Sequence, residues 1–299
     1  MIRYASAAAS GSIIRRDRPL TNDEILRAAP SVFAQEAHES RGDRYGFIPT
    51  SSVLAGLRDA GFEPFEARQT RVRDQGKREH TRHLLRLRHA NSAMVEGITP
   101  EILLLNSHDG SSSYRLMTGF FRMICDNGLV AGDICDDTKV LHRGRQNLVD
   151  DVIDGCIRTL DNIEAATTRI QAYRSISLSD HQQRALAEAA LTLKYDDPAK
   201  APILASSLLE ARRFEDRKND LFTTFNRIQE NLIKGGLRGR SSNGRRTTTR
   251  AVTGVDQDVK LNRALWTLAD RLAQVVAPAG WFESDERTAD EAQALELAH

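Results

Sequence analysis

Basic side chains that could bind phosphate gather in two stretches of the sequence. Residues 66–91 carry eight lysines and arginines against three acidic residues, and residues 234–250 carry six against none. Arginine stays charged at physiological pH and donates paired hydrogen bonds, so such stretches are typical of phosphate-binding surfaces. We predict that twelve of these side chains contact nucleic acid: Arg71, Arg73, Lys77, Arg78, Arg82, Arg86, Arg88, Arg238, Arg240, Arg245, Arg246 and Arg250.

The first basic stretch has the pattern of two strands, residues 64–74 and 80–90, joined by a short glycine-containing turn. Side chains alternate along a strand, so Arg82, Arg86 and Arg88 share one face while leucines occupy the other. An antiparallel pair would then present one basic and one apolar face. The competing interpretation is the solvated outer face that antiparallel sheets ordinarily have.

The second basic stretch, residues 234–250, is rich in glycine and serine, which leave its backbone mobile. Such a segment can order on a phosphate backbone, so we expect a mobile basic clamp. The alternative is a solubilising loop between helices. The stretch has no aromatic residue, and base stacking would need another source.

A third candidate group lies at residues 106–111, where serine, histidine and aspartate stand side by side. A hydrolase or nuclease using His108 and Asp109 is one alternative. Catalytic triads are assembled from distant segments, so we expect a strand-to-helix turn and no catalytic residue. The amide groups of Ser111, Ser112 and Ser113 would then stand at a helix N-terminus and form an anion site.

The histidines of the first basic stretch do not suit a metal ion. His83 and His89 fall on one face of their strand but stand about 20 Å apart, too far for one ion. We therefore expect no metal and no cofactor. The three cysteines are odd in number and lack paired spacing, which favours reduced thiols in the cytoplasm.

The elements that must position these residues indicate an α+β fold, with a small antiparallel sheet and a buried helix followed by a mostly helical C-terminal half. Thr21 and Glu24 have the spacing of a capping box. Residues 111–130 are apolar around most of a helical circumference, which predicts a central buried helix. Further helices are expected at 50–61, at 147–233 with breaks near 175–179 and 196–202, and at 256–277, and a third strand at 101–107.

The charge is distributed in opposed blocks. The 299 residues sum to a formal charge of +1, yet residues 66–91 carry +5, residues 234–250 carry +6 and residues 283–299 carry −5. This pattern fits a polyanion binder whose acidic tail competes for its own basic surface. No stretch approaches the ~18 apolar residues of a membrane span. We divide the chain into a flexible arm (1–20), an α+β core domain (21–132), a helical region (133–233), a basic flexible segment (234–255), a C-terminal helix (256–282) and an acidic tail (283–299).

Four stretches together resemble a known family. Their sequences are YGFIPT at 45–50, NSHDGS at 106–111, FFRMICDNGL at 120–129 and DVKLNRALW at 258–266. They resemble the phage/plasmid-like proteins built on a domain of unknown function and found on bacterial mobile elements, over about residues 45–275. The resemblance implies a cytoplasmic protein of phages, plasmids or integrative elements, and it supplies no catalytic residue.

The expected order of helix, strand hairpin, third strand and buried helix is also similar to the core of phage-type single-strand annealing proteins. Those proteins oligomerise and hold single-stranded DNA in a basic groove. We therefore predict a non-enzymatic, homo-oligomeric protein of a mobile element that binds or anneals single-stranded nucleic acid in DNA recombination. The alternatives are an interaction protein that inhibits a host defence system through a host partner, and a self-assembling structural protein.

Overall fold

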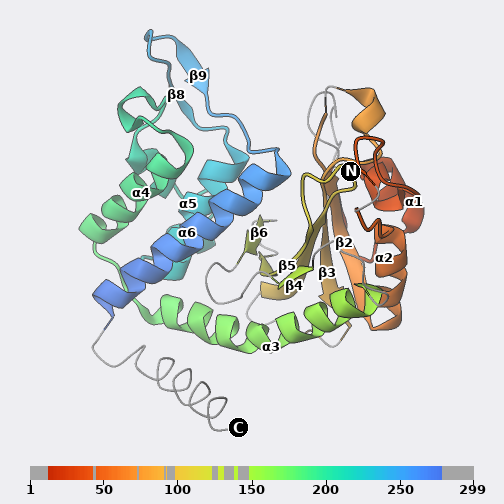
Figure 1. The fold of residues 1–299 in the computed structure, drawn as a ribbon. Coiled ribbons are helices and arrows are strands. Elements are labelled where there is room, and N and C mark those ends of the chain that lie inside the picture. Colours follow the sequence, from red (N-terminus) through yellow and green to blue (C-terminus); the bar gives the residue numbers. More distant parts are fainter. Residues whose placement is uncertain are drawn as a thin grey trace, which may run out of the picture. The chain divides into compact units, whose positions relative to one another are not determined.

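The computed structural model describes residues 13–42, 45–72, 74–90, 92, 98–122, 127–130, 138–140 and 148–277, drawn in colour in Figure 1. The chain divides into two compact units. Unit 1 comprises Met1–Thr168, Ile233–Gly236 and Arg250–Ala264, and unit 2 comprises Arg169–Leu232, Leu237–Thr249 and Leu265–His299. Three described helices contribute residues to both units: α3 (Leu148–Ser175), α5 (Leu221–Lys234) and α6 (Val255–Val276).

Unit 1 is built on an antiparallel sheet whose first six strands follow the order of the chain. The pairings place Ala67 opposite Leu85, Leu85 opposite Leu104, and Leu104 opposite Leu116, so one apolar row crosses four strands. The seventh strand pairs with β5. The strands are β1 (Ile13–Arg15), β2 (Phe62–Gln69), β3 (His83–His89), β4 (Ile98–Asn106), β5 (Tyr114–Arg122), β6 (Asn127–Val130) and β7 (Thr138–Val140).

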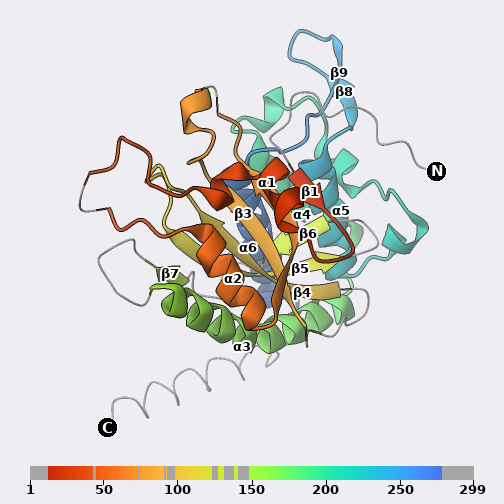
Figure 2. The same cartoon turned by 90° about the vertical axis from the view of Figure 1, so that its right-hand side faces the viewer.

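Both faces of this sheet are covered. On one face, α1 (Asn22–Ala28), α2 (Thr50–Asp59) and the start of α3 enclose a core with Leu85 and Leu104 (Figure 2). On the other face, Val255 and Val259 of α6 pack against strand leucines. The capping box predicted for α1 is confirmed, since Glu24 N donates to Thr21 Oγ1 at 3.3 Å and Thr21 N to Glu24 Oε2 at 3.0 Å.

The helix predicted over residues 111–130 is wrong, because the described residues of this stretch form β5 and β6. Tyr114 and Leu116 pack in the core on one face, while Met117 packs on the other. A strand buried on both faces is apolar all round, as a buried helix is, and periodicity does not separate the two. The flexible arm is a second correction, since residues 13–15 pair with β2; residues 1–12 lie outside the described residues.

Unit 2 is mostly helical. Its helices are the C-terminal part of α3, α4 (Asp180–Lys194), α5 up to Leu232, the end of α6, and three short 3₁₀ helices, η4 (Pro198–Lys200), η5 (Ala205–Leu209) and η6 (Phe214–Arg217). A two-stranded hairpin within residues 237–249 also belongs to this unit. Residues 221–232 of α5 are all buried, and Trp266 packs between Tyr173 and Phe225 at ring separations of 5.5 and 6.1 Å.

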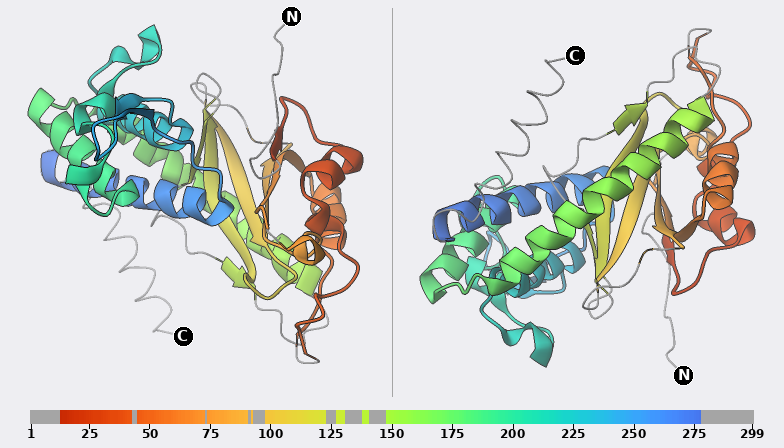
Figure 3. Two further views of the ribbon diagram at one scale, coloured as in Figure 1. Left: turned by 90° about the horizontal axis from the view of Figure 1, so that it is seen from above. Right: turned by 90° about the horizontal axis from the view of Figure 1, so that it is seen from below.

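The structure confirms the α+β class, with an antiparallel sheet and a helical C-terminal half. Within residues 147–233 the structure has the predicted helices as α3, α4 and α5, but residues 205–217 contain the short η5 and η6 where a continuing helix was expected. The helix predicted at 256–277 is α6, and α3 is one continuous helix, green in Figure 3. The basic segment predicted to be flexible instead contains a hairpin of β8 (Arg238–Arg240) and β9 (Arg246–Thr248).

Candidate nucleic-acid interface

The arginines of β3 share one face, as strand alternation predicts, but that face is occupied by carboxylates of unit 1. Arg86 is 2% exposed; its Nε donates to Glu101 Oε2, and its Nη2 donates to the carbonyl of Phe120 at 3.2 Å. Arg88 Nε donates to Glu101 Oε1 at 2.9 Å, and its guanidinium lies 4.1 Å from the ring centroid of Phe65. Arg86 is therefore closed to a phosphate, which corrects the prediction for this residue.

Neighbouring arginines are engaged in the same way. Arg68 pairs with Glu66 at 3.0 Å and also with Asp258 of α6, while Arg82 pairs with Asp256 and donates from Nε to Ser111 Oγ at 3.1 Å. A buried charge is costly unless it is paired, so the ion pairs of Arg68 allow this part of the strand face to be covered. The Arg82–Asp256 pair lies at the surface, where its side chains are 29% and 49% exposed. The basic strand face predicted for nucleic acid thus binds α6 and strand carboxylates.

Burial and the neighbouring positive charges shift the pKa of Glu66 in opposite directions. Burial alone would raise the pKa of this carboxyl, but the positive charges of Arg15, Arg68 and Arg86 outweigh it and lower the pKa to about 2. Glu66 is therefore ionised in the folded protein at neutral pH. The arginines of this face hold a buried carboxylate in place of an external phosphate.

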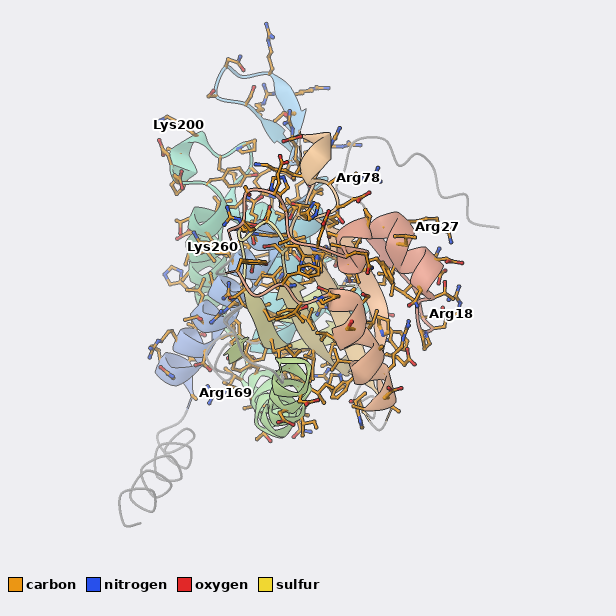
Figure 4. All side chains as sticks on the ribbon, turned by 45° about the vertical axis from the view of Figure 1, so that its right-hand side comes forward. Arg18, Arg27, Arg78, Arg169, Lys200 and Lys260 are labelled. Atoms are coloured by element: carbon orange, nitrogen blue, oxygen red, sulfur yellow. The ribbon has the colours of Figure 1, made fainter. Side chains whose placement is uncertain are left out.

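The connection between β2 and β3 keeps exposed cations. Arg71, Lys77 and Arg78 are exposed, and Arg78 is labelled in Figure 4. The turn is fixed by local hydrogen bonds, since Gly76 N donates to Asp74 Oδ1 at 3.0 Å. Arg73 lies outside the described residues. These three side chains remain candidates for phosphate contact on unit 1.

The hairpin of β8 and β9 presents a second set of cations, on unit 2. Arg240 stands directly opposite Arg246, and Arg238 stands opposite Thr248. By strand alternation, Arg238, Arg240 and Arg246 share one face of the hairpin. All three are exposed, as is Arg245 in the turn, and none of the four pairs with a carboxylate of the described residues. Arg250, also exposed, follows the hairpin in sequence and belongs to unit 1.

The opposite face of the hairpin is packed against the preceding segment of unit 2. Arg240 N donates to the carbonyl of Pro202 at 2.7 Å, and a Cβ atom placed on Gly239 would lie 1.8 Å from the same oxygen. Only glycine permits this approach, because any side chain would collide with the backbone. The docking fixes which face is turned outward, and in Figures 1 and 2 the hairpin projects beyond α4 and α5.

The turn at residues 107–113 is not the predicted anion site. No helix begins there, because Tyr114 starts β5. Ser111 N donates to Asp109 Oδ1 at 2.9 Å and Ser112 N donates to Ser107 Oγ at 2.8 Å, so these two amides already have partners. Ser113 precedes the strand and caps no helix. In place of the predicted site at Ser111, Ser112 and Ser113, the structure has a turn held by hydrogen bonds among its own residues and from Arg82.

His108 belongs to a buried polar cluster that sequence patterns did not reveal. The hydroxyl oxygen of Thr50 lies 3.0 Å from His83 Nε2, 3.2 Å from His108 Nε2 and 3.1 Å from the hydroxyl of Tyr114. Both histidines have no exposed surface, and burial lowers the pKa of His83 to about 4. A substrate has no access to these imidazoles, and the cluster's evident role is to join the start of α2 to β3, β4 and β5.

The described residues also bear on whether the protein could hold a metal ion or cross a membrane. Within this part of the chain, no group of three or more histidine, cysteine, aspartate or glutamate side chains is arranged to hold a metal ion. Among the described helices, none combines the length and the apolar character needed to cross a membrane. Cys156 is buried with a free thiol whose pKa is raised to about 12 by burial, whereas Cys125 and Cys135 lie outside the described residues.

Comparison with known proteins identifies relatives along almost the whole chain. Two proteins of Escherichia coli strain K12, UPF0380 protein YafZ and UPF0380 protein YfjQ, are each 50% identical over 272 residues, which is 91% of this chain and 98% of theirs. No solved structure matches the chain. Residues 37–266 match the family described as Domain of unknown function (DUF932). That match spans most of the chain, which therefore belongs to the DUF932 family.

Proposed function

We propose that this protein binds single-stranded nucleic acid through the outward face of the β8–β9 hairpin and has no enzymatic activity. The observation that carries the proposal is the direct opposition of Arg240 and Arg246, with Arg238 beside them. Like charges placed opposite each other destabilise a strand pair. Residues 234–250 contain no acid that could relieve this repulsion. A bound polyanion would relieve it.

The spacing on the hairpin suits a chain of phosphates. Side chains two residues apart on one strand, such as Arg238 and Arg240, stand about 7 Å apart. This is close to the separation of successive phosphates in an extended strand. Each guanidinium can therefore meet a different phosphate, with paired hydrogen bonds to its oxygens. Arg245 in the turn extends the same basic surface.

Unit 1 carries a separate group of exposed cations, Arg71, Lys77 and Arg78, in the β2–β3 connection. We propose that these side chains also contact phosphate. We propose that the protein acts as a homo-oligomer and brings complementary strands together in recombination of a mobile element in the cytoplasm. The mobile-element setting follows from the resemblance of the four sequence stretches to phage/plasmid-like proteins.

The test uses the full chain and labelled oligonucleotides. Fluorescence anisotropy would compare a 30-nucleotide single strand with its duplex at 50 and 200 mM salt, and native mass spectrometry would count protein copies with and without the strand. We expect tighter binding of the single strand and a steep loss of affinity with salt. The proposal fails if the single strand does not bind at 50 mM salt or if affinity is independent of salt.

A further inference from the structure

Phe214 is an aromatic side chain of unit 2 that packs into no core. It is the first residue of η6 and is 75% exposed. Complete burial of a phenylalanine side chain typically contributes ~1.5–3 kcal/mol to stability, and the fold forgoes most of that contribution here. In contrast, Phe222 and Phe225 of the same unit are each 2% exposed. The position of Phe214 therefore needs an explanation other than packing.

The turn that carries Phe214 is held firmly. Its neighbour Arg213 donates from Nε to Asp216 Oδ2 at 2.9 Å and from Nη1 to Glu230 Oε1 at 3.2 Å. Arg212 Nε donates to Asn231 Oδ1 at 2.7 Å. Both Glu230 and Asn231 lie on the buried helix α5. The exposed ring is thus displayed from a turn anchored to the core of unit 2.

Arg217 lies beside the ring. The guanidinium carbon of Arg217 lies 5.4 Å from the ring centroid, and Lys218 follows it; both are exposed. Of the nearby carboxylates, Asp216 and Glu230 are paired with Arg213, which leaves Glu215 as the exposed acid of the turn. An apolar ring beside an exposed guanidinium matches a ligand that combines flat aromatic groups with negative charge.

We infer that Phe214 stacks on an unpaired nucleobase while Arg217 contacts the adjoining phosphate. This inference rests on the proposed function and specifies its ligand, because the face of a base is available to a side chain only where the strand is unpaired. Stacking on an aromatic residue is tolerant of sequence, since every base has a π-face. The ring belongs to the same unit as the basic hairpin, and residues 234–250 have no aromatic of their own.

The experiment compares Phe214→Ala, Phe214→Trp and a matched control, Leu204→Ala, which removes another apolar side chain of unit 2 that is 76% exposed. We expect Phe214→Ala to weaken single-strand binding about tenfold with an unchanged salt slope, and to leave duplex binding unaltered. Phe214→Trp should keep the affinity and gain a tryptophan signal that the single strand quenches, measured against wild type. Leu204→Ala should bind as wild type.

Several results would overturn the inference. They are a change of less than twofold in Phe214→Ala, an equal loss on single strand and duplex, or an unquenched signal in Phe214→Trp. Circular dichroism of each variant verifies that it is folded, and the two substitutions give independent readouts. If the wild-type chain itself fails to bind the single strand, the proposed function falls as well, which distinguishes that failure from one confined to Phe214.

Discussion

Neutralising the hairpin arginines should change the salt dependence of nucleic-acid binding by a calculable amount. In the triple variant R238Q/R240Q/R246Q the three outward side chains of β8 and β9 lose their charge, and the packed face with Gly239 is untouched. Each phosphate contact on a single strand contributes about 0.7 to the slope of log affinity against log salt. Three contacts give a change of about 2, so wild type should lose about twentyfold more affinity than the variant between 50 and 200 mM salt.

The assay is an anisotropy titration of a labelled single strand at four or more salt concentrations. A matched control, R27Q/R184Q/R271Q, removes three exposed arginines scattered over α1, α4 and α6, and should leave the slope within half a unit of wild type. Thermal unfolding would verify that both variants are folded. An unchanged slope in the hairpin variant, or an equal change in the control, would refute the assignment of phosphate contacts to this face.

Four further predictions follow from the structure and the sequence. Replacing Arg86 by alanine should lower the free energy of unfolding by about 3 kcal/mol in urea titrations, because the buried carboxylate of Glu101 loses the more deeply buried of its two arginine partners and keeps only Arg88, while the salt slope of binding stays unchanged. Gly239→Ala should dislodge the hairpin, seen as faster tryptic cleavage there and weaker single-strand binding, whereas Gly42→Ala, where the added Cβ meets nothing within 4 Å, should do neither. Glu66 has its pKa lowered to about 2 from 4.5, so its contribution to stability is present above about pH 4.5 and should fade as the pH falls toward 2; in E66Q the urea midpoint should depend less on pH over that range. Deleting residues 283–299, which lie outside the described residues, should tighten single-strand binding at low salt; unchanged affinity would show that the acidic tail does not compete.

Local signals in the sequence predict much of the fold. The capping box at Thr21, the glycine-containing link between β2 and β3, and the periodicity of α4 and α5 each depend on residues close together in the chain. The prediction of a helix over 111–130 was wrong because the strand that forms there is buried on both faces by segments distant in the chain, and local periodicity does not report such packing. Nothing in the residues themselves says that Val255 and Val259 will cover the second face of the sheet.

For the candidate site too, local patterns predicted correctly only what depends on neighbouring residues. Alternation placed Arg86 and Arg88 on one face correctly, but the buried partner Glu101 comes from another strand and could not be located from local patterns. Glu101 did leave a signal, since a lone acid within an apolar strand needs a cation on the same face. Phe214 has the spacing of a helical face with Leu221 and Phe225, which predicts a buried helical residue, but α5 begins at Leu221 and Phe214 lies exposed in η6.

One face of the β8–β9 hairpin packs against its own unit and the other faces outward, and this difference affects which substitutions the protein can accept in evolution. Gly239 is fixed by its approach to Pro202, whereas Arg238, Arg240 and Arg246 project outward and touch no core. Substitutions at the outward positions can therefore adjust ligand affinity with little effect on folding. Among DUF932 proteins, we expect this hairpin to be a place where binding preference diverges by single substitutions on a constant scaffold.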